Sequence, residues 1–191
     1  MSVPLILASG SPRRRELLAY LGIPFEVIPG NAEELTQGKP EELVCANARA
    51  KALAVSMQQT DTLVLGADTI VCLDEKILGK PHNTEEAHDM LRSLSGRWHV
   101  VYTGICLARD SETVIACEAT RVLFSALTEQ DIEQYVQTGE PMDKAGAYAI
   151  QGIGGQFIEK IEGSPSNVIG LPLTLVRRML QEQKPPVSSQ I

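Results

Sequence analysis

The hydrophobic residues of this chain fall into short runs separated by longer, periodically apolar stretches, a pattern that predicts strands alternating with helices. Residues 5–8 and 25–28 are apolar runs typical of short strands. Helices are expected from Pro12 and from Pro40, because proline suits the first helical position, where its missing N–H costs nothing. In the second helix, apolar residues recur at near-helical spacing and predict its buried face: Leu43, Ala46, Ala50, Leu53 and Met57.

The middle of the chain carries its strongest strand pattern. Residues 62–74 are dense in leucine, valine and isoleucine, which predicts a long central strand. Residues 98–109 and 113–127 are alternating and rich in β-branched residues, so they predict an antiparallel hairpin. Further helices are expected at about 84–94, at 128–139 and from 172, and a last strand at 156–163. Together these elements indicate an α/β fold with a mixed, twisted sheet flanked by helices.

Length and charge narrow the class of protein. The chain of 191 residues suits one domain, or one domain with two lobes, which we assign to residues 1–184. We expect residues 185–191 to form a flexible C-terminal tail. The formal net charge of −7 argues against a nucleic-acid partner, which favours a basic surface. A site for a polyphosphate would therefore be a local cluster of cations.

The sequence also favours a cytoplasmic protein. No apolar run approaches the roughly 20 residues that span a bilayer, and no basic segment precedes the first apolar run. The four cysteines form no C-x-x-C pair, which favours free thiols in a reducing compartment. The three histidines have no zinc-type spacing, so a metal would be held by oxygen ligands.

The turn after the first strand has the properties of an anion site. Ser9 and Gly10 break the strand, and Ser11 is a good N-cap for the helix that begins at Pro12. Three arginines follow in the first helical turn. Free N–H groups, the positive end of the helix dipole and cationic side chains together favour binding of phosphate. The alternative is that the arginines serve only solubility.

Asp68 is the strongest catalytic candidate from physical reasoning alone. It lies inside the apolar run 62–74, where a carboxylate is costly unless it is paired or bound to a metal. The small residues before it, Gly66 and Ala67, would let a ligand approach the backbone. The alternative is a structural carboxylate that accepts hydrogen bonds from a neighbouring loop.

A glycine-rich segment at 139–155 is the second unusual stretch. It has little hydrophobic periodicity, and an irregular segment of this length is more often functional than idle. Gln151 lies within it between Ile150 and Gly152, where its amide could face a ligand. Lys80 lies between a glycine and a proline, which predicts a defined loop.

Five motifs in this order resemble those of the Maf (septum-formation inhibitor-like) nucleoside triphosphate pyrophosphatases: SGSPRR at 9–14, GADT at 66–69, GKP at 79–81, KAGAYAIQG at 144–152 and VIGLP at 168–172. The resemblance covers nearly the whole chain. It implies a two-lobed fold with a central cleft, like that of the inosine triphosphate pyrophosphatases. It also implies a homodimer and hydrolysis of a nucleoside triphosphate to the monophosphate and pyrophosphate, assisted by Mg²⁺ or Mn²⁺.

The resemblance implies a catalytic set of acids and lysines. Asp68 acts as general base on the attacking water, or holds the metal that activates it, and Glu34 is its partner in metal binding. Lys51 and Lys80, together with Arg14, offset the negative charge of the phosphates. From its helical context alone, Lys51 could equally be a solvated side chain.

The remaining residues implied by the resemblance bind the substrate. Ser9 and Gly10 face the phosphates, whereas Arg13, Thr69 and Gln151 hold the base and look like the dTTP/UTP branch of the family. A uracil or thymine edge presents carbonyl acceptors and one N–H donor, which a glutamine amide can match. A site built for such an edge rejects bases that leave its polar groups unpaired.

Three alternatives remain open at this point. Modified pyrimidines share the same hydrogen-bonding edge, so this reasoning does not exclude them as substrates. The 7-methyl-GTP branch resembles this chain outside the three base-contacting positions. A nucleotide-sensing protein that regulates septum formation would keep the base site without needing the acids and lysines.

Overall fold

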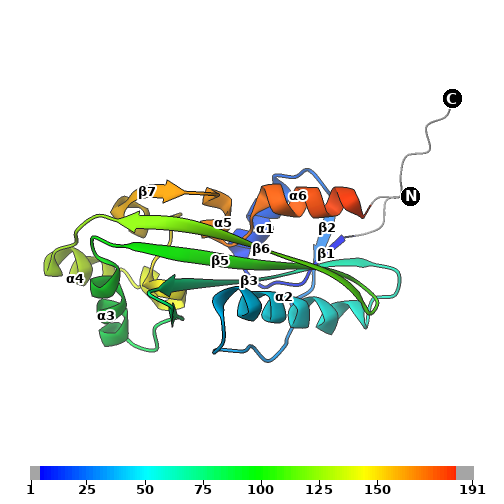
Figure 1. The fold of residues 1–191 in the computed structure, drawn as a ribbon, viewed down its shortest axis with the longest axis horizontal. Coiled ribbons are helices and arrows are strands. Elements are labelled where there is room, and N and C mark those ends of the chain that lie inside the picture. Colours follow the sequence, from blue (N-terminus) through cyan, green and yellow to red (C-terminus); the bar gives the residue numbers. More distant parts are fainter. Residues whose placement is uncertain (1–4, 184–191) are drawn as a thin grey trace.

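A single mixed sheet forms the centre of the molecule. The computed structural model describes residues 5–183, and Figure 1 shows helices on both sides of the long central strands. The strand order is β2-β1-β3-β5-β6-β7, with β4 paired beside β3. The strands are β1 (Leu5–Leu7), β2 (Phe25–Val27), β3 (Leu63–Leu73), β4 (Lys76–Leu78), β5 (Trp98–Arg109), β6 (Glu112–Phe124) and β7 (Ile158–Glu162).

The pairing confirms the predicted mixed sheet. Strand β1 runs parallel to β2 and β3, whereas β3, β5, β6 and β7 form antiparallel pairs. The helices are α1 (Pro12–Ala19), α2 (Pro40–Ser56), α3 (Thr84–Leu94), α4 (Glu129–Gln137), α5 (Pro165–Ile169) and α6 (Leu173–Glu182). Helix α2 covers one side of β3, β5 and β6, and α1 and α6 lie on the other side (Figure 1).

Local sequence signals fix most helix starts. The Ser11 side chain accepts a hydrogen bond from the backbone N–H of Arg14, as expected of the N-cap of α1. Thr128 and Asp131 form a reciprocal capping box at α4. Helix α5 was not predicted, because five residues are too few to show a helical period, although Ser164 caps it and Pro165 begins it. The glycine-rich segment forms three short 3-10 turns: Glu140–Asp143, Ala145–Ala147 and Ile153–Phe157.

The predicted buried face of α2 is partly wrong. Met57 is 66% exposed, and the helix instead buries Leu43, Val44, Asn47, Ala48, Ala52, Val55 and Ser56. Two glycines explain this rotation, because they let the α2 backbone lie directly against the sheet. A Cβ added to Gly66 would lie 2.3 Å from the carbonyl oxygen of Ala48, and one added to Gly104 would lie 2.3 Å from that of Val44. The expectation that Gly66 admits a ligand is therefore wrong, since α2 occupies that space.

Two hydrophobic clusters divide the molecule into the two predicted lobes. One packs α3 and α4 against one end of the sheet, with Leu91, Phe124 and Tyr135 at its centre. The other packs α1 and α6 against the opposite end, around Leu18 and Val176. Because β3 and β5 contribute to both clusters, the lobes share one continuous sheet. The assignment of residues 1–184 to one domain stays a prediction, and the predicted tail at 185–191 lies outside the described residues.

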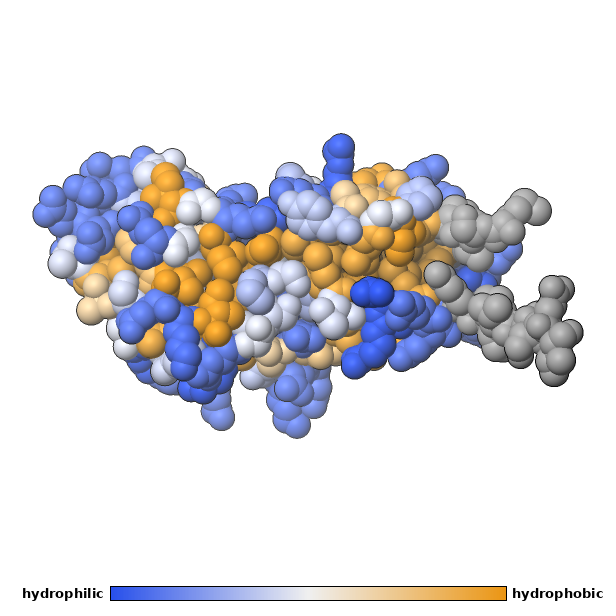
Figure 2. Space-filling model, turned by 90° about the horizontal axis from the view of Figure 1, so that it is seen from above, coloured by the Kyte–Doolittle hydropathy of each residue, from blue (hydrophilic) through white to orange (hydrophobic). Residues whose placement is uncertain are grey.

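The surface that carries β7 and α6 shows apolar side chains along its middle and hydrophilic ones toward its edges (Figure 2). Among the helices of residues 5–183, none combines the length and apolar character needed to cross a membrane.

Candidate functional site

A gap along one edge of β3 creates the site. Strand β1 pairs with β3 at residues 63–65, and β4 pairs with it at residues 71–73. Over the described residues, the stretch of β3 between these pairings has a strand neighbour only on its β5 side. Successive side chains of a strand point to opposite faces, so Asp68 and Thr69 reach this opening from the two sides of the sheet. Both line a cleft of about 990 Å³ between the lobes.

The cleft brings together every residue predicted for the site. They come from the first turn, the loop after β2, helix α2, strand β3, the loop after β4 and the glycine-rich segment. The ten residues are Ser9, Gly10, Arg13, Arg14, Glu34, Lys51, Asp68, Thr69, Lys80 and Gln151. Their convergence on one cleft supports the predicted site, whereas their individual roles stay predictions.

Lys51 joins the two acids of the predicted catalytic set. Its Nζ lies 2.7 Å from Oδ1 of Asp68 and 2.8 Å from Oε1 of Glu34. The side chains of Lys51 and Asp68 are only 11% and 8% exposed, so the prediction of a solvated Lys51 is wrong. Partial burial opposes ionisation of Glu34, but the hydrogen bond and charge of Lys51, with Lys80 and Arg14, lower the pKa of Glu34 overall. The cleft therefore holds a buried ion pair extended by a second, more accessible carboxylate.

Sequence reasoning missed Asn47, which organises both acids. Its Nδ2 donates to Oδ2 of Asp68 and to the carbonyl oxygen of Leu35, each at 3.0 Å. Its Oδ1 accepts from the backbone N–H of Leu35 at 2.8 Å. Asn47 thus orients Asp68 and fastens the loop that carries Glu34. The available signal was its position four residues before Lys51, which places both side chains on the same face of α2.

Arg14 connects three parts of the cleft wall. Its Nη1 donates to the carbonyl oxygen of Ala67 at 2.9 Å and to Oγ of Ser9 at 3.3 Å. Its Nε donates to the carbonyl oxygen of Gly170 at 2.8 Å, and its Nη2 to Oγ1 of Thr69 at 2.9 Å. Burial lowers the pKa of Arg14, against the raising effect of Asp68 and Glu34. Four of the five N–H groups of the guanidinium therefore hold the first turn to β3 and α5, which leaves one for a ligand.

The glycine-rich segment forms the opposite wall of the cleft. Its Gly146 N–H donates to the carbonyl oxygen of Gly79 at 3.0 Å, which ties the segment to the loop of Lys80. The Tyr148 hydroxyl lies 2.8 Å from Nε2 of His99, a β5 residue that is only 2% exposed. These contacts anchor the stretch that leads to Gln151.

The buried His99 predicts an acid-sensitive step in stability. Burial lowers the pKa of His99 from 6.5 to about 4. Below about pH 6.5, His99 is protonated in the unfolded chain but stays neutral in the folded protein until the pH nears 4. The free energy of unfolding therefore falls as the pH falls toward 4. Between pH 7 and pH 5 we expect His99 to account for a loss of about 2 kcal/mol. Urea unfolding of wild type and His99→Gln at both values measures this loss, and equal losses in the two proteins would contradict it.

The donor set of the cleft is compatible with a hard divalent cation. The carboxylates of Asp68 and Glu34 converge on one point, the Lys51 ammonium. Within residues 5–183 no cluster of three or more potential metal ligands occurs among Asp, Glu, His and Cys. Mg²⁺ is commonly held by one or two carboxylates together with water and substrate phosphates. The two carboxylates therefore suit a cation that binds together with a phosphorylated ligand, and the roles of Asp68 and Glu34 as its protein ligands stay predictions.

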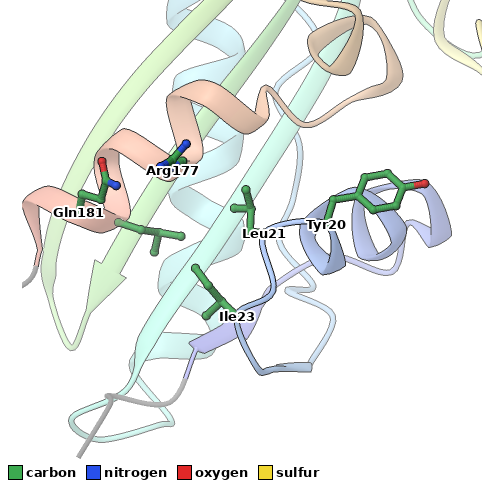
Figure 3. A pocket seen from close by; sticks show the side chains of 6 residues that line it. Tyr20, Leu21, Ile23, Arg177 and Gln181 are labelled. Atoms are coloured by element: carbon green, nitrogen blue, oxygen red, sulfur yellow. The ribbon is translucent and has the colours of Figure 1, made fainter.

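A smaller hollow lies away from these groups, between the end of α1 and α6 (Figure 3). Its volume is about 360 Å³, and Leu21 and Ile23 point toward α6 across it. Arg177 is the one charged side chain that lines this hollow, and none of the predicted site residues lines it. The polar groups that could perform chemistry therefore lie in the larger cleft.

Comparisons with known proteins find relatives that match almost the whole chain. The chain is 49% identical over 184 residues to a protein named dTTP/UTP pyrophosphatase from Gloeobacter violaceus, covering 95% of this chain and 97% of the relative. It is 47% identical over 180 residues to a protein of the same name from Bacillus cereus strain AH820, and this match covers 93% of this chain and 94% of the relative.

Two solved structures share the fold. A HAM1 protein from Coxiella burnetii matches with a TM-score of 0.58 and 16% identity, and the Staphylococcus aureus Ham1 protein with 0.52 and 15%. Each match covers 95% of this chain and all of the other. These structures confirm the predicted fold, which is that of the Ham1 and inosine triphosphate pyrophosphatase proteins, and carry no argument about substrate. The model of the Maf-like protein family matches residues 4–183. Because this match and the relatives at 47–49% identity extend over almost the whole chain, the chain belongs to the Maf-like protein family.

Proposed function

We propose that this protein hydrolyses dTTP and UTP to the corresponding monophosphate and pyrophosphate. The observation that carries the proposal is the 47–49% identity, over more than nine-tenths of the chain, to relatives named dTTP/UTP pyrophosphatase. The cleft supports it independently, because it gathers an acid pair, cationic side chains and a helix N-terminus at one place.

In this mechanism Asp68 accepts the proton of the attacking water. Lys51 and Asn47 hold the two oxygens of its carboxylate, at 2.7 and 3.0 Å, in a fixed orientation. Both partners donate hydrogen bonds to the carboxylate, which fixes the directions of its remaining lone pairs. A carboxylate has about four acceptor positions, so two remain for water. Lys51 and Lys80 offset the charge of the phosphates, without which a negatively charged nucleophile could not approach.

The phosphates lie against the first turn and the base against the opposite wall. Ser9, Gly10 and the N-terminus of α1 face the triphosphate, since free N–H groups and the helix dipole favour anions there. Arg13, Thr69 and Gln151 contact the pyrimidine. Modified pyrimidines that keep the same hydrogen-bonding edge are substrates in this account.

A divalent cation, Mg²⁺ or Mn²⁺, is part of the proposal. When bound with the substrate it would neutralise phosphate charge and lower the pKa of a water molecule. Removal of divalent cations with EDTA should lower pyrophosphate release by at least about 100-fold, and added Mg²⁺ or Mn²⁺ should restore it. Full activity in excess EDTA, checked by elemental analysis of the protein, would contradict a role for the metal.

A substrate panel tests the proposed function. Pyrophosphate release is measured with dTTP, UTP, CTP, dCTP, GTP, ATP, ITP and 7-methyl-GTP under identical conditions. Turnover of dTTP and UTP at least about tenfold above the others is the expected result, because other bases leave the site's polar groups unpaired. Preference for 7-methyl-GTP or ITP would overturn the base assignment, and absence of turnover would favour a nucleotide-sensing protein.

The cellular setting completes the proposal. The substrates and the four free cysteines suit the cytoplasm. The homodimer implied by the family resemblance stays a prediction, which sedimentation velocity of the full chain tests directly.

A further inference from the structure

Glu140 makes a three-point contact with the turn that follows Gln151. Its Oε2 accepts from the backbone N–H of Ile153, and its Oε1 accepts from the backbone N–H of Gly154, both at 2.9 Å. Its Oε1 also accepts from the hydroxyl of Tyr135 at 2.9 Å. Hydrogen bonds to an ionised carboxylate are roughly twice as strong as neutral ones, so these three hold the turn firmly.

The turn is shaped to receive this carboxylate. Gly152 has a φ of +140°, a conformation that strongly favours glycine. A Cβ added to Gly152 would lie 2.5 Å from Oε2 of Glu140, so any other residue would push the carboxylate away. Gln151 directly precedes this glycine, and its backbone direction therefore depends on the contact with Glu140.

The other side of Glu140 is fixed to the core. Tyr135 is a residue of α4, is 1% exposed, and packs edge-on against the ring of Phe157 at a centroid distance of 5.1 Å. A Cβ added to Gly154 would lie 2.4 Å from the Tyr135 hydroxyl, so the turn and α4 are in close contact. Glu140 therefore links the loop that carries Gln151 to helix α4 through hydrogen bonds on both sides. Glu140 itself is not among the residues that line the cleft.

We propose that Glu140 is a positioning residue for Gln151, and that it sets the preference of the site for a uracil or thymine edge over a cytosine edge. This inference rests on the proposed function, in which Gln151 contacts the base. A cytosine edge presents an amino donor where thymine presents a carbonyl acceptor. The two are distinguished only if the glutamine amide is held in one orientation.

Glu140→Gln is the most direct variant. The glutamine side chain has nearly the same shape, but it replaces one acceptor oxygen with an N–H₂ group. That group would face a backbone N–H of the turn and lose a hydrogen bond. The experiment measures equilibrium binding of the non-hydrolysable α,β-methylene analogues of dTTP and dCTP, by calorimetry, to wild type, Glu140→Gln, Gln151→Ala and the double variant. The exposed Glu159→Gln serves as the matched control, and its preference should equal that of wild type.

We expect Glu140→Gln to lower the ratio of the two affinities by about tenfold, with most of the loss in binding of the thymine analogue. The double variant should show the same ratio as Gln151→Ala, because Glu140 acts through that side chain. An unchanged ratio in Glu140→Gln, even with a lower melting temperature, overturns the inference. A ratio in the double variant below that of Gln151→Ala also overturns it. Since binding is measured, failure of wild type to hydrolyse dTTP would refute the proposed function separately.

Discussion

Replacing Asp68 with asparagine should lower the turnover of dTTP by about 100- to 10,000-fold. The substitution keeps the size of the side chain but removes the only group that the mechanism uses to accept a proton from water. Binding of dTTP measured without a divalent cation should change much less, because the protein contacts of Asp68 are with Lys51 and Asn47. Pyrophosphate release and calorimetric binding, measured on the same preparation, separate the two effects.

Asp89→Asn provides the control for this substitution. Asp89 is an exposed residue of α3 that pairs with Arg92, and exposed pairs contribute little to stability. This variant should retain wild-type turnover. Turnover of Asp68→Asn within about threefold of wild type would exclude Asp68 as the general base, because such a base contributes far more than that.

Replacing Lys51 with methionine should have the largest combined effect on stability and activity. The substitution leaves the buried Asp68 carboxylate without its cation and places it near that of Glu34. Removing one partner of a buried ion pair costs about 3–5 kcal/mol. Activity should fall by at least about 100-fold, because the charge that offsets the phosphates is lost as well. Urea unfolding at pH 7.5 and steady-state kinetics measure both quantities.

The pH dependence of the Lys51→Met effect identifies its cause. Lys51 lowers the pKa of Glu34 below its ordinary value of 4.5, so its contribution is present above that value and is lost as the pH falls through the lowered pKa. The stability difference between wild type and variant should therefore shrink below about pH 4.5. Lys39→Met, which removes an exposed ion pair just before α2, should change stability by less than about 1 kcal/mol. An equally small change for Lys51→Met would contradict the buried ion pair.

Local patterns were sufficient for most of the fold. The run at 62–74 could be assigned as a central strand because a nearly continuous run of leucine, valine and isoleucine is typical of a strand that is buried on both faces. Ser11 and Thr128 marked helix starts because capping depends on neighbours within three residues. The five-residue α5 was missed although Ser164 caps it, because a single turn shows no apolar period and its contacts with β5 and β6 are distant in sequence.

The contacts of the site required three-dimensional information. Asp68 was recognised as a buried acid that needs a partner, but Lys51 is 17 residues away and periodicity could not show which side of α2 faces the sheet. The correct face depends on Gly66 and Gly104, which are distant from α2 in sequence. Asn47 was missed because its one signal, the spacing of four residues to Lys51, has meaning only once the sheet-facing side of α2 is known. The assignment of Arg13, Thr69 and Gln151 came from family resemblance, which physical reasoning alone could not have supplied.

In the proposed reaction, the cleft between the lobes splits a pyrimidine nucleoside triphosphate between its first and second phosphates. The most direct measurement is ³¹P NMR of dTTP incubated with the full chain and Mg²⁺. We expect the dTTP resonances to be replaced by those of dTMP and pyrophosphate in equal amounts, and Asp68→Asn to abolish the change. Formation of dTDP and orthophosphate, or an unchanged spectrum with wild type, would contradict it.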